Sequence, residues 1–120
     1  MAYNVRTVDG DVKVVEAAGQ LDHHNGTKLM QETLDPIKRI RGARVVVNFG
    51  KVEYICSAAI AILIEVNDKL TAHGGKFACC NISPEVMEVL DLLAIPEVIP
   101  CLETEADAIK AVSGEAEASA

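Results

Sequence analysis

Short apolar runs alternate with helix-length segments along this chain, and this alternation limits its fold more than any other feature. The clearest run is residues 43–49, ARVVVNF, a continuous apolar stretch that is typical of a strand buried on both faces. From about Ser57, apolar residues recur at helical spacing until Gly74 and Gly75 end the pattern. Strands that alternate with helices in this way predict an α/β layer structure with parallel strand pairs.

Four further strands are expected besides 43–49. Asp9-Gly10 lies within residues 4–19 and separates two β-rich stretches, which is the strongest short signal for a hairpin. The apolar segments 76–82 and 97–102 each predict one strand, and Pro100 favours an edge position for the second. The chain therefore predicts two antiparallel strands followed by three that alternate with helices.

Four helices are expected between and after these strands. The first follows a polar turn and is interrupted by Pro36. The second begins near Ser57, the third follows Ser83 as N-cap, and the fourth follows Thr104 as N-cap. The predicted order is β-β-α-β-α-β-α-β-α, a mixed β-sheet with mostly parallel central strands.

The length of 120 residues suits one domain with a single core. Aromatic residues make up 3% of the chain and there is no Trp, so this core must consist mainly of Val, Ile, Leu and Ala. We expect the domain to occupy residues 1–113 and a flexible acidic tail to occupy residues 114–120.

Charge and hydropathy argue against several classes of protein. Eighteen acidic against 11 basic residues give a net charge of −7, which does not suit a nucleic-acid binder. The longest apolar run, 58–64, is far shorter than the roughly 20 residues of a membrane span. The first residues lack the pattern of a secretory signal. We therefore expect a cytoplasmic protein with no nucleic-acid partner and no direct membrane insertion.

The residues for conventional catalysis are scarce. His23 and His24 fall in a turn, and His73 lies near a helix end. None of the three has an evident partner residue for metal binding or for general-base catalysis. The chain has neither a phosphate-binding glycine loop nor a dinucleotide-binding motif. We expect no enzyme activity, no metal and no cofactor.

Residues 54–63, YICSAAIAIL, place a Cys-Ser pair where a helix is expected to begin. Ser57 can cap the helix, or carry a phosphate that faces the free N–H groups of the first turn. Cys56 can be a small buried filler, or a thiol whose pKa the helix N-terminus lowers, as in a thiol redox protein. The residues alone leave these alternatives open.

Two short motifs make the chain resemble a known family. Gly19-Gln20-Leu21-Asp22 matches the glycine-x-leucine-aspartate motif that follows the early strand of the STAS domain. Residues 54–61, YICSAAIA, match the segment in which bacterial anti-sigma factor antagonists carry aspartate-serine-serine-glycine. The resemblance covers about residues 12–112 and keeps the order of strands and helices. It implies a single STAS-like domain.

The resemblance also implies a function. Ser57 occupies the position that an anti-sigma factor serine kinase phosphorylates in the family, and a PP2C-type phosphatase reverses that step. A partner-switching regulator of this kind binds the kinase only when the serine is unmodified. The resemblance thus predicts a partner-binding surface made by Asp22, Cys56, Ser57, Ala58, Ala59 and Ile60.

This chain departs from the family pattern beside the phosphoacceptor. Cys56 replaces the acid, Ala58 the second serine, and Ala59 and Ala61 the two glycines. A phosphorylation-independent STAS docking subunit of a transporter or signalling complex is therefore the main alternative to a partner switch. The sequence leaves open the oligomeric state, the input signal, and the identity of the anti-sigma and sigma factors.

Overall fold

The computed structural model describes residues 4–8, 11–22 and 24–113, in which five strands form one sheet in sequence order. Only the first pair is antiparallel, and the other three pairs are parallel, which confirms the predicted mixed sheet with parallel central strands. Asp9, Gly10 and the tail 114–120 lie outside the described residues. The strands are β1 (Asn4–Val8), β2 (Val12–Leu21), β3 (Arg44–Ile55), β4 (Lys76–Cys80) and β5 (Cys101–Leu102).

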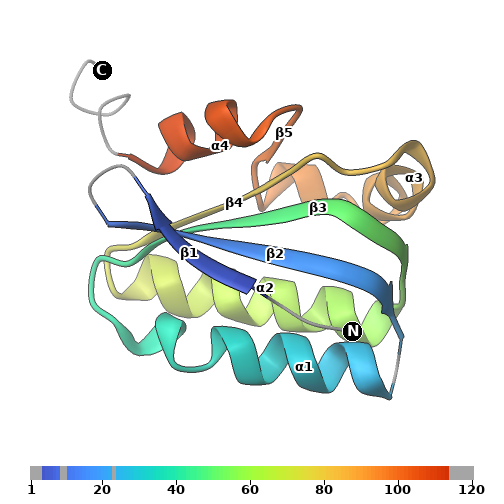
Figure 1. Ribbon diagram of the computed structural model, residues 1–120, viewed down its shortest axis with the longest axis horizontal. Coiled ribbons are helices and arrows are strands. Elements are labelled where there is room, and N and C mark those ends of the chain that lie inside the picture. The colour runs from blue at the N-terminus through green and yellow to red at the C-terminus, as the bar shows by residue number, and fades with distance from the viewer. Residues whose placement is uncertain (1–3, 9–10, 23, 114–120) are drawn as a thin grey trace.

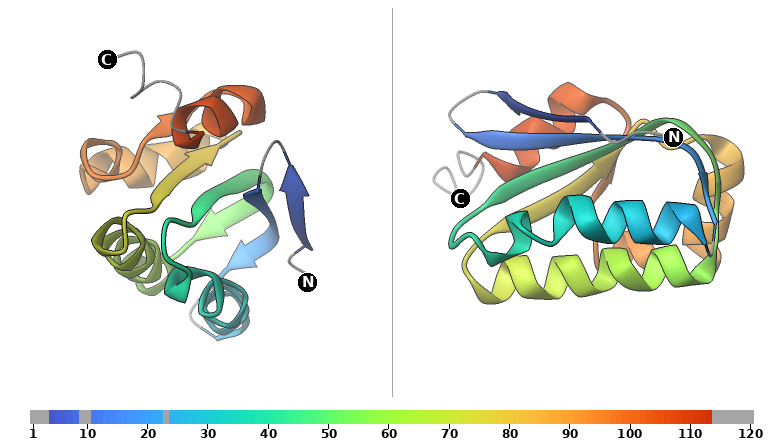
Figure 2. Two further views of the ribbon diagram at one scale, coloured as in Figure 1. Left: turned by 90° about the vertical axis from the view of Figure 1, so that its left-hand side faces the viewer. Right: turned by 60° about the horizontal axis from the view of Figure 1, so that its bottom comes forward.

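The helices cover both faces of this sheet (Figure 1). They are α1 (Asn25–Leu34), α2 (Ser57–Ala72), α3 (Pro84–Leu92) and α4 (Glu105–Val112), with 3-10 helices η1 (Ile37–Arg39) and η2 (Ile95–Glu97). Figure 2 shows α1 and α2 side by side on one face, whereas α4 lies on the opposite face. Consecutive parallel strands joined by right-handed crossovers place their connecting helices on the same face, which accounts for α1 and α2.

The apolar run in β3 supplies both layers of the core. Val45 and Val47 face α1 and α2, and Val46 faces α4, because successive side chains of a strand point to opposite faces. All three are fully buried, which confirms that this strand is covered on both sides. Phe49 completes the larger layer, so the core relies on branched aliphatic residues with a single fully buried aromatic ring among the described residues.

The structure corrects the predicted bounds of several elements. Strand β2 continues to Leu21, so the polar turn is shorter than predicted. Helix α1 ends at Leu34, and after Pro36 the chain forms η1 instead of a further α-helical turn. The last strand was predicted at 97–102 but contains only Cys101–Leu102. Within 97–102, Pro100 lacks the N–H group that a longer ladder would need, and Glu97 is the last residue of η2.

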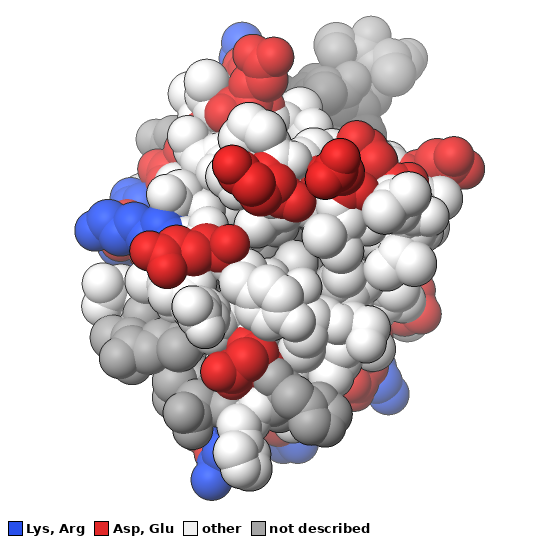
Figure 3. Space-filling view, turned by 90° about the vertical axis from the view of Figure 1, so that its right-hand side faces the viewer, with Lys and Arg blue, Asp and Glu red and all other residues white. Residues whose placement is uncertain are grey.

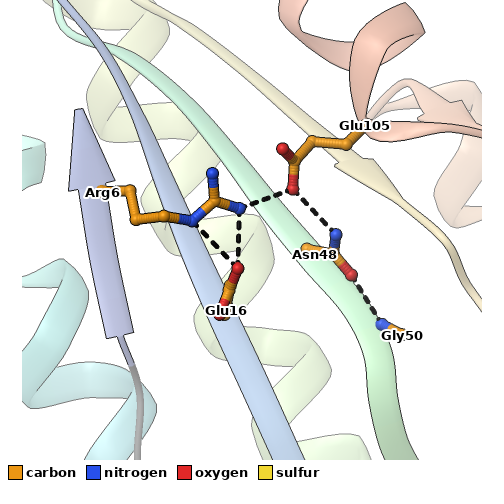
Figure 4. A network of polar contacts seen from close by, with 5 residues as sticks. All are labelled: Arg6, Glu16, Asn48, Gly50 and Glu105. Carbon is orange, nitrogen blue, oxygen red and sulfur yellow. Dashed lines mark hydrogen bonds and ion pairs between the residues drawn. The ribbon is translucent and has the colours of Figure 1, made fainter. Parts of the chain in front are cut away.

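A polar network ties the N-terminal hairpin to α4 across this sheet (Figure 4). Arg6 on β1 forms ion pairs with Glu16 on β2 at 2.7 Å and with Glu105 on α4 at 2.8 Å. Asn48 donates to Glu105 at 2.9 Å and accepts from the Gly50 N–H at 2.7 Å. Partial burial disfavours the Glu105 carboxylate, but the hydrogen bonds from Asn48 and Arg6 and the Arg6 charge outweigh this and lower its pKa.

We expect Glu105→Gln to lower the free energy of unfolding by about 1 kcal/mol at pH 7, with a smaller effect in acid. Because its folded-state pKa is lowered, Glu105 stabilises the protein above the unfolded glutamate value of about 4.3, and that stability is lost as the pH falls further. Urea unfolding at pH 7 and about pH 3 measures the difference. The control is Glu103→Gln, at an exposed residue that forms no ion pair with the described residues. An effect of Glu105→Gln that is equal at both pH values would contradict this assignment.

Candidate functional site

The carboxyl ends of β2, β3 and β4 meet at one edge of the sheet and lead into α1, α2 and α3 (Figure 1). Leu21 pairs with Ile55 where β2 and β3 end. The N–H of Cys56 donates to the carbonyl oxygen of Leu21 at 3.0 Å. Asp22 and Ser57 therefore follow directly after two paired strand ends. Loops at this edge are the usual place for function in open α/β sheets.

Asp22 holds the start of α1. Its Oδ1 accepts hydrogen bonds from the N–H of His24 at 3.1 Å and of Gly26 at 3.3 Å. Its carbonyl oxygen accepts from the N–H of Thr27 at 3.1 Å. The carboxylate thereby satisfies N–H groups that have no partner within the helix. Its part in a partner surface stays a prediction.

Ser57 is the first residue of α2 and does not cap it. The N-cap is Cys56, with extended backbone angles and no hydrogen bond from its side chain, so the interpretation of Ser57 as a cap is wrong. The Ser57 side chain is exposed, and its hydroxyl forms no hydrogen bond with the described residues. The N–H groups of Ser57, Ala58 and Ala59 likewise find no acceptor in that part of the chain. The first turn also contains no acidic residue.

Two of the six predicted surface residues are buried. Ala59 is 0% exposed and Ile60 is 2% exposed, and both pack into the larger core layer. They cannot present side chains to a partner in this structure, which disagrees with their expected place on the surface. Ala58 is half-buried, so the accessible part of the segment centres on Ser57.

The four cysteines are free thiols with different surroundings. The Cys56 side chain is half-buried against the core, and its thiol forms no hydrogen bond or ion pair with the described residues. Burial raises the pKa of Cys79 well above its usual value, that of Cys80 to about 12, and that of Cys101 to about 11. These three thiols are therefore protonated at neutral pH.

On the side of the molecule drawn in Figure 3, several separate acidic side chains surround a small uncharged area. Glu53 near the end of β3 is exposed, as are Glu88 and Asp91 on α3. Apolar side chains are exposed as well: Tyr54 is 50% exposed, and Leu92 at the end of α3 is 81% exposed. Sequence reasoning did not single out Leu92, although it falls outside the spacing of the buried Val86 and Leu90.

The described part of the chain contains neither a metal-binding cluster nor a membrane-spanning helix. No group of three or more His, Cys, Asp or Glu side chains could hold a metal ion among the described residues. No helix in residues 4–8, 11–22 and 24–113 is long and apolar enough to cross a membrane.

Comparisons with known proteins agree with this architecture. A family model, the STAS domain, matches residues 3–108. The anti-sigma F factor antagonist of Paenibacillus polymyxa is 22% identical over 98 residues, which are 82% of this chain and 84% of that protein.

Two solved structures share the fold. An anti-sigma factor antagonist from Mycobacterium paratuberculosis superimposes with a TM-score of 0.83 at 23% identity, over 93% of each chain. The Bacillus cell fate determinant SpoIIAA in its phosphorylated form gives 0.68 at 22% identity, over 91% of this chain and 97% of that one. By the extent of the family match, this chain belongs to the STAS domain family.

Proposed function

We propose that this protein is a partner-switching regulator of the anti-sigma factor antagonist type. In this proposal it binds an anti-sigma factor serine kinase while Ser57 is unmodified, and phosphorylation of Ser57 ends the binding. A PP2C-type phosphatase then restores the binding form. The protein acts through its surface and its charge, without catalysis of its own, in the cytoplasm.

The observation that carries this proposal is the position of Ser57. Its hydroxyl is exposed at the N-terminus of a 16-residue helix and forms no hydrogen bond with the described part of the chain. Three N–H groups of the first turn lack acceptors among the described residues, and the positive end of the helix favours an anion there. Cys56 in place of an acid also removes a charge that would repel a phosphate. The named relatives support the same function.

The absence of the family's acid and glycines has a structural consequence for this proposal. Ala59 lies in the core, so its methyl group packs against the sheet and does not obstruct an approaching kinase. Ala61 is exposed on α2, one turn beyond Ser57, and adds one methyl group to the surface. The kinase that recognises this chain must therefore accept neutral residues, Cys56 and Ala58, on both sides of the serine in sequence.

We expect a fraction of the protein isolated from its own cells to carry one phosphate on Ser57, and that fraction to change between growth and stress. Intact mass and peptide mapping measure it. The matched control is Ser83 in the same preparation, whose hydroxyl accepts a hydrogen bond from the Val86 N–H at 3.3 Å and caps α3. Ser83 should stay unmodified. An unmodified Ser57 in every condition would refute the switch and favour a phosphorylation-independent docking subunit. An adduct on Cys56 would favour the thiol alternative.

A further inference from the structure

The outward side of α3 contains a groove that the proposed function does not use. Its volume is about 390 Å³, and its lining residues are Pro84, Met87, Glu88, Asp91 and Leu92. We call it the α3 groove. Val86 and Leu90 on the other side of the helix are buried, so α3 is held to the core without help from the groove residues Glu88, Asp91 and Leu92.

The residues that line the groove include both apolar and acidic side chains. Leu92 is 81% exposed, the highest value for a large apolar side chain in the described part of the chain. Met87 is only partly buried, and its flexible side chain suits a surface that adapts to a partner. Glu88 and Asp91 are exposed and form no ion pair with any described residue, so both charges are available to a partner.

The negative charge of the groove's lining residues indicates which partner can bind there. A second copy of this chain bound symmetrically would bring Glu88 and Asp91 against the same residues, and like charges in an interface oppose association. The chain's own tail 114–120 contains Glu115 and Glu117 and no basic residue, so it is disfavoured for the same reason. A helix that presents apolar residues at spacings of three and four, flanked by Lys or Arg, is complementary to both the apolar and the acidic residues of the groove.

Helix α3 and the start of α2, where Ser57 is the first residue, lie at the same end of the molecule (Figure 1). The molecule measures 38 × 26 × 22 Å, so this end spans only the two shorter dimensions. A specific interface covers about 800 Å² on each partner. A partner of that footprint centred on Ser57 must extend across most of this end, and α3 is part of it.

We propose that the α3 groove binds a basic, amphipathic helical segment of the protein that covers Ser57. This inference rests on the proposed function for the identity of that protein, the serine kinase. It adds a second contact, in which Leu92 is the apolar anchor and Glu88 and Asp91 select for basic residues. Binding through the groove falls as salt concentration rises, since the charges are exposed.

The test uses the full chain and two synthetic helical peptides with the same leucine spacing, one carrying lysines and the other glutamates. Backbone amide NMR shifts locate binding. We expect the lysine peptide to shift amides of 84–92 and the glutamate peptide to bind at least about tenfold more weakly. Leu92→Ala should weaken the lysine peptide about tenfold. Leu93→Ala is the matched control, because Leu93 is adjacent and 53% exposed but does not line the groove.

Three results would overturn the proposal: equal binding of the two peptides, shifts centred away from α3, or equal effects of Leu92→Ala and Leu93→Ala. A chain that dimerises in sedimentation and becomes monomeric in Leu92→Ala would also overturn it, in favour of a second copy. Phosphate on Ser57 is measured separately in cells. If the lysine peptide binds the groove while Ser57 is never phosphorylated, the groove proposal stands and the switch proposal fails. If Ser57 is phosphorylated but the lysine peptide does not bind the groove, the switch proposal stands and the groove proposal fails.

Discussion

Gly26→Ala should destabilise the protein by about 3 kcal/mol or more, although alanine is the better helix former by about 1 kcal/mol. A Cβ atom at Gly26 would lie 2.4 Å from the Leu21 Cα, 2.7 Å from the Leu21 carbonyl carbon and 2.8 Å from the Gln20 oxygen. All three are backbone atoms, which cannot move aside as a flexible side chain can. Urea unfolding of the variant measures the loss.

The effect should extend to the candidate site. Leu21 accepts the hydrogen bond from the Cys56 N–H, so displacing the end of β2 also displaces the start of α2. The control is Gln31→Ala, at an exposed position of the same helix, which we expect to change stability by no more than about 0.5 kcal/mol. A Gly26→Ala variant that is as stable as the parent, or more stable, would show that the close approach of α1 to β2 is wrong.

The sheet was predictable because each strand carries its own local signal. Val45, Val46 and Val47 form an uninterrupted apolar run, and such a run occurs in strands that are buried on both faces. The segment 97–102 is also largely apolar, but only Cys101–Leu102 pairs as a strand, and Glu97 belongs to η2. Ala94, just before η2, has a left-handed conformation with φ of 57°. Spacing alone does not reveal such a backbone reversal.

The start of α2 was predicted to within one residue, whereas the role of its first residues as a partner surface stays a prediction. Whether Cys56 or Ser57 becomes the N-cap depends on where β3 ends, and pairing with β2 across the sheet decides that. Residues 58–64 are apolar throughout, so their spacing does not identify the side of α2 that meets the sheet. Further along α2 the helical spacing is informative, because Ile60, Leu63 and Val66 recur on the side that is buried, whereas only the family resemblance placed Ile60 on the partner surface. The exposure of Leu92 follows from the same kind of tertiary packing.

Ser57→Asp should weaken binding to the serine kinase by about 30-fold or more, without loss of stability. An Asp in the first turn of a helix is favourable by about 0.3–1 kcal/mol, so the fold should be unaffected or slightly stabilised. The residues next to Ser57 in sequence, Cys56 and Ala58, are neutral, and Tyr54 before them is neutral and half-exposed. An Asp carboxylate at Ser57 would lose its hydration in such an interface and gain no basic partner, which weakens binding. Calorimetric titration of the kinase with each variant measures the change.

Ser83→Asp separates a specific switch from general repulsion. It places the same charge at the start of α3, on the same edge of the sheet, and Asp can replace Ser as the N-cap. Ser57→Ala removes the hydroxyl without adding charge. A switch at Ser57 requires that Ser57→Ala binds the kinase as the parent does and that Ser83→Asp binds it no more weakly, because Ser83 is next to Pro84 of the acidic α3 groove, while Ser57→Asp does not bind. Equal losses in the two aspartate variants would mean that the kinase responds to the total negative charge of this face. Full binding by Ser57→Asp would mean that the exposed serine is not part of the contact.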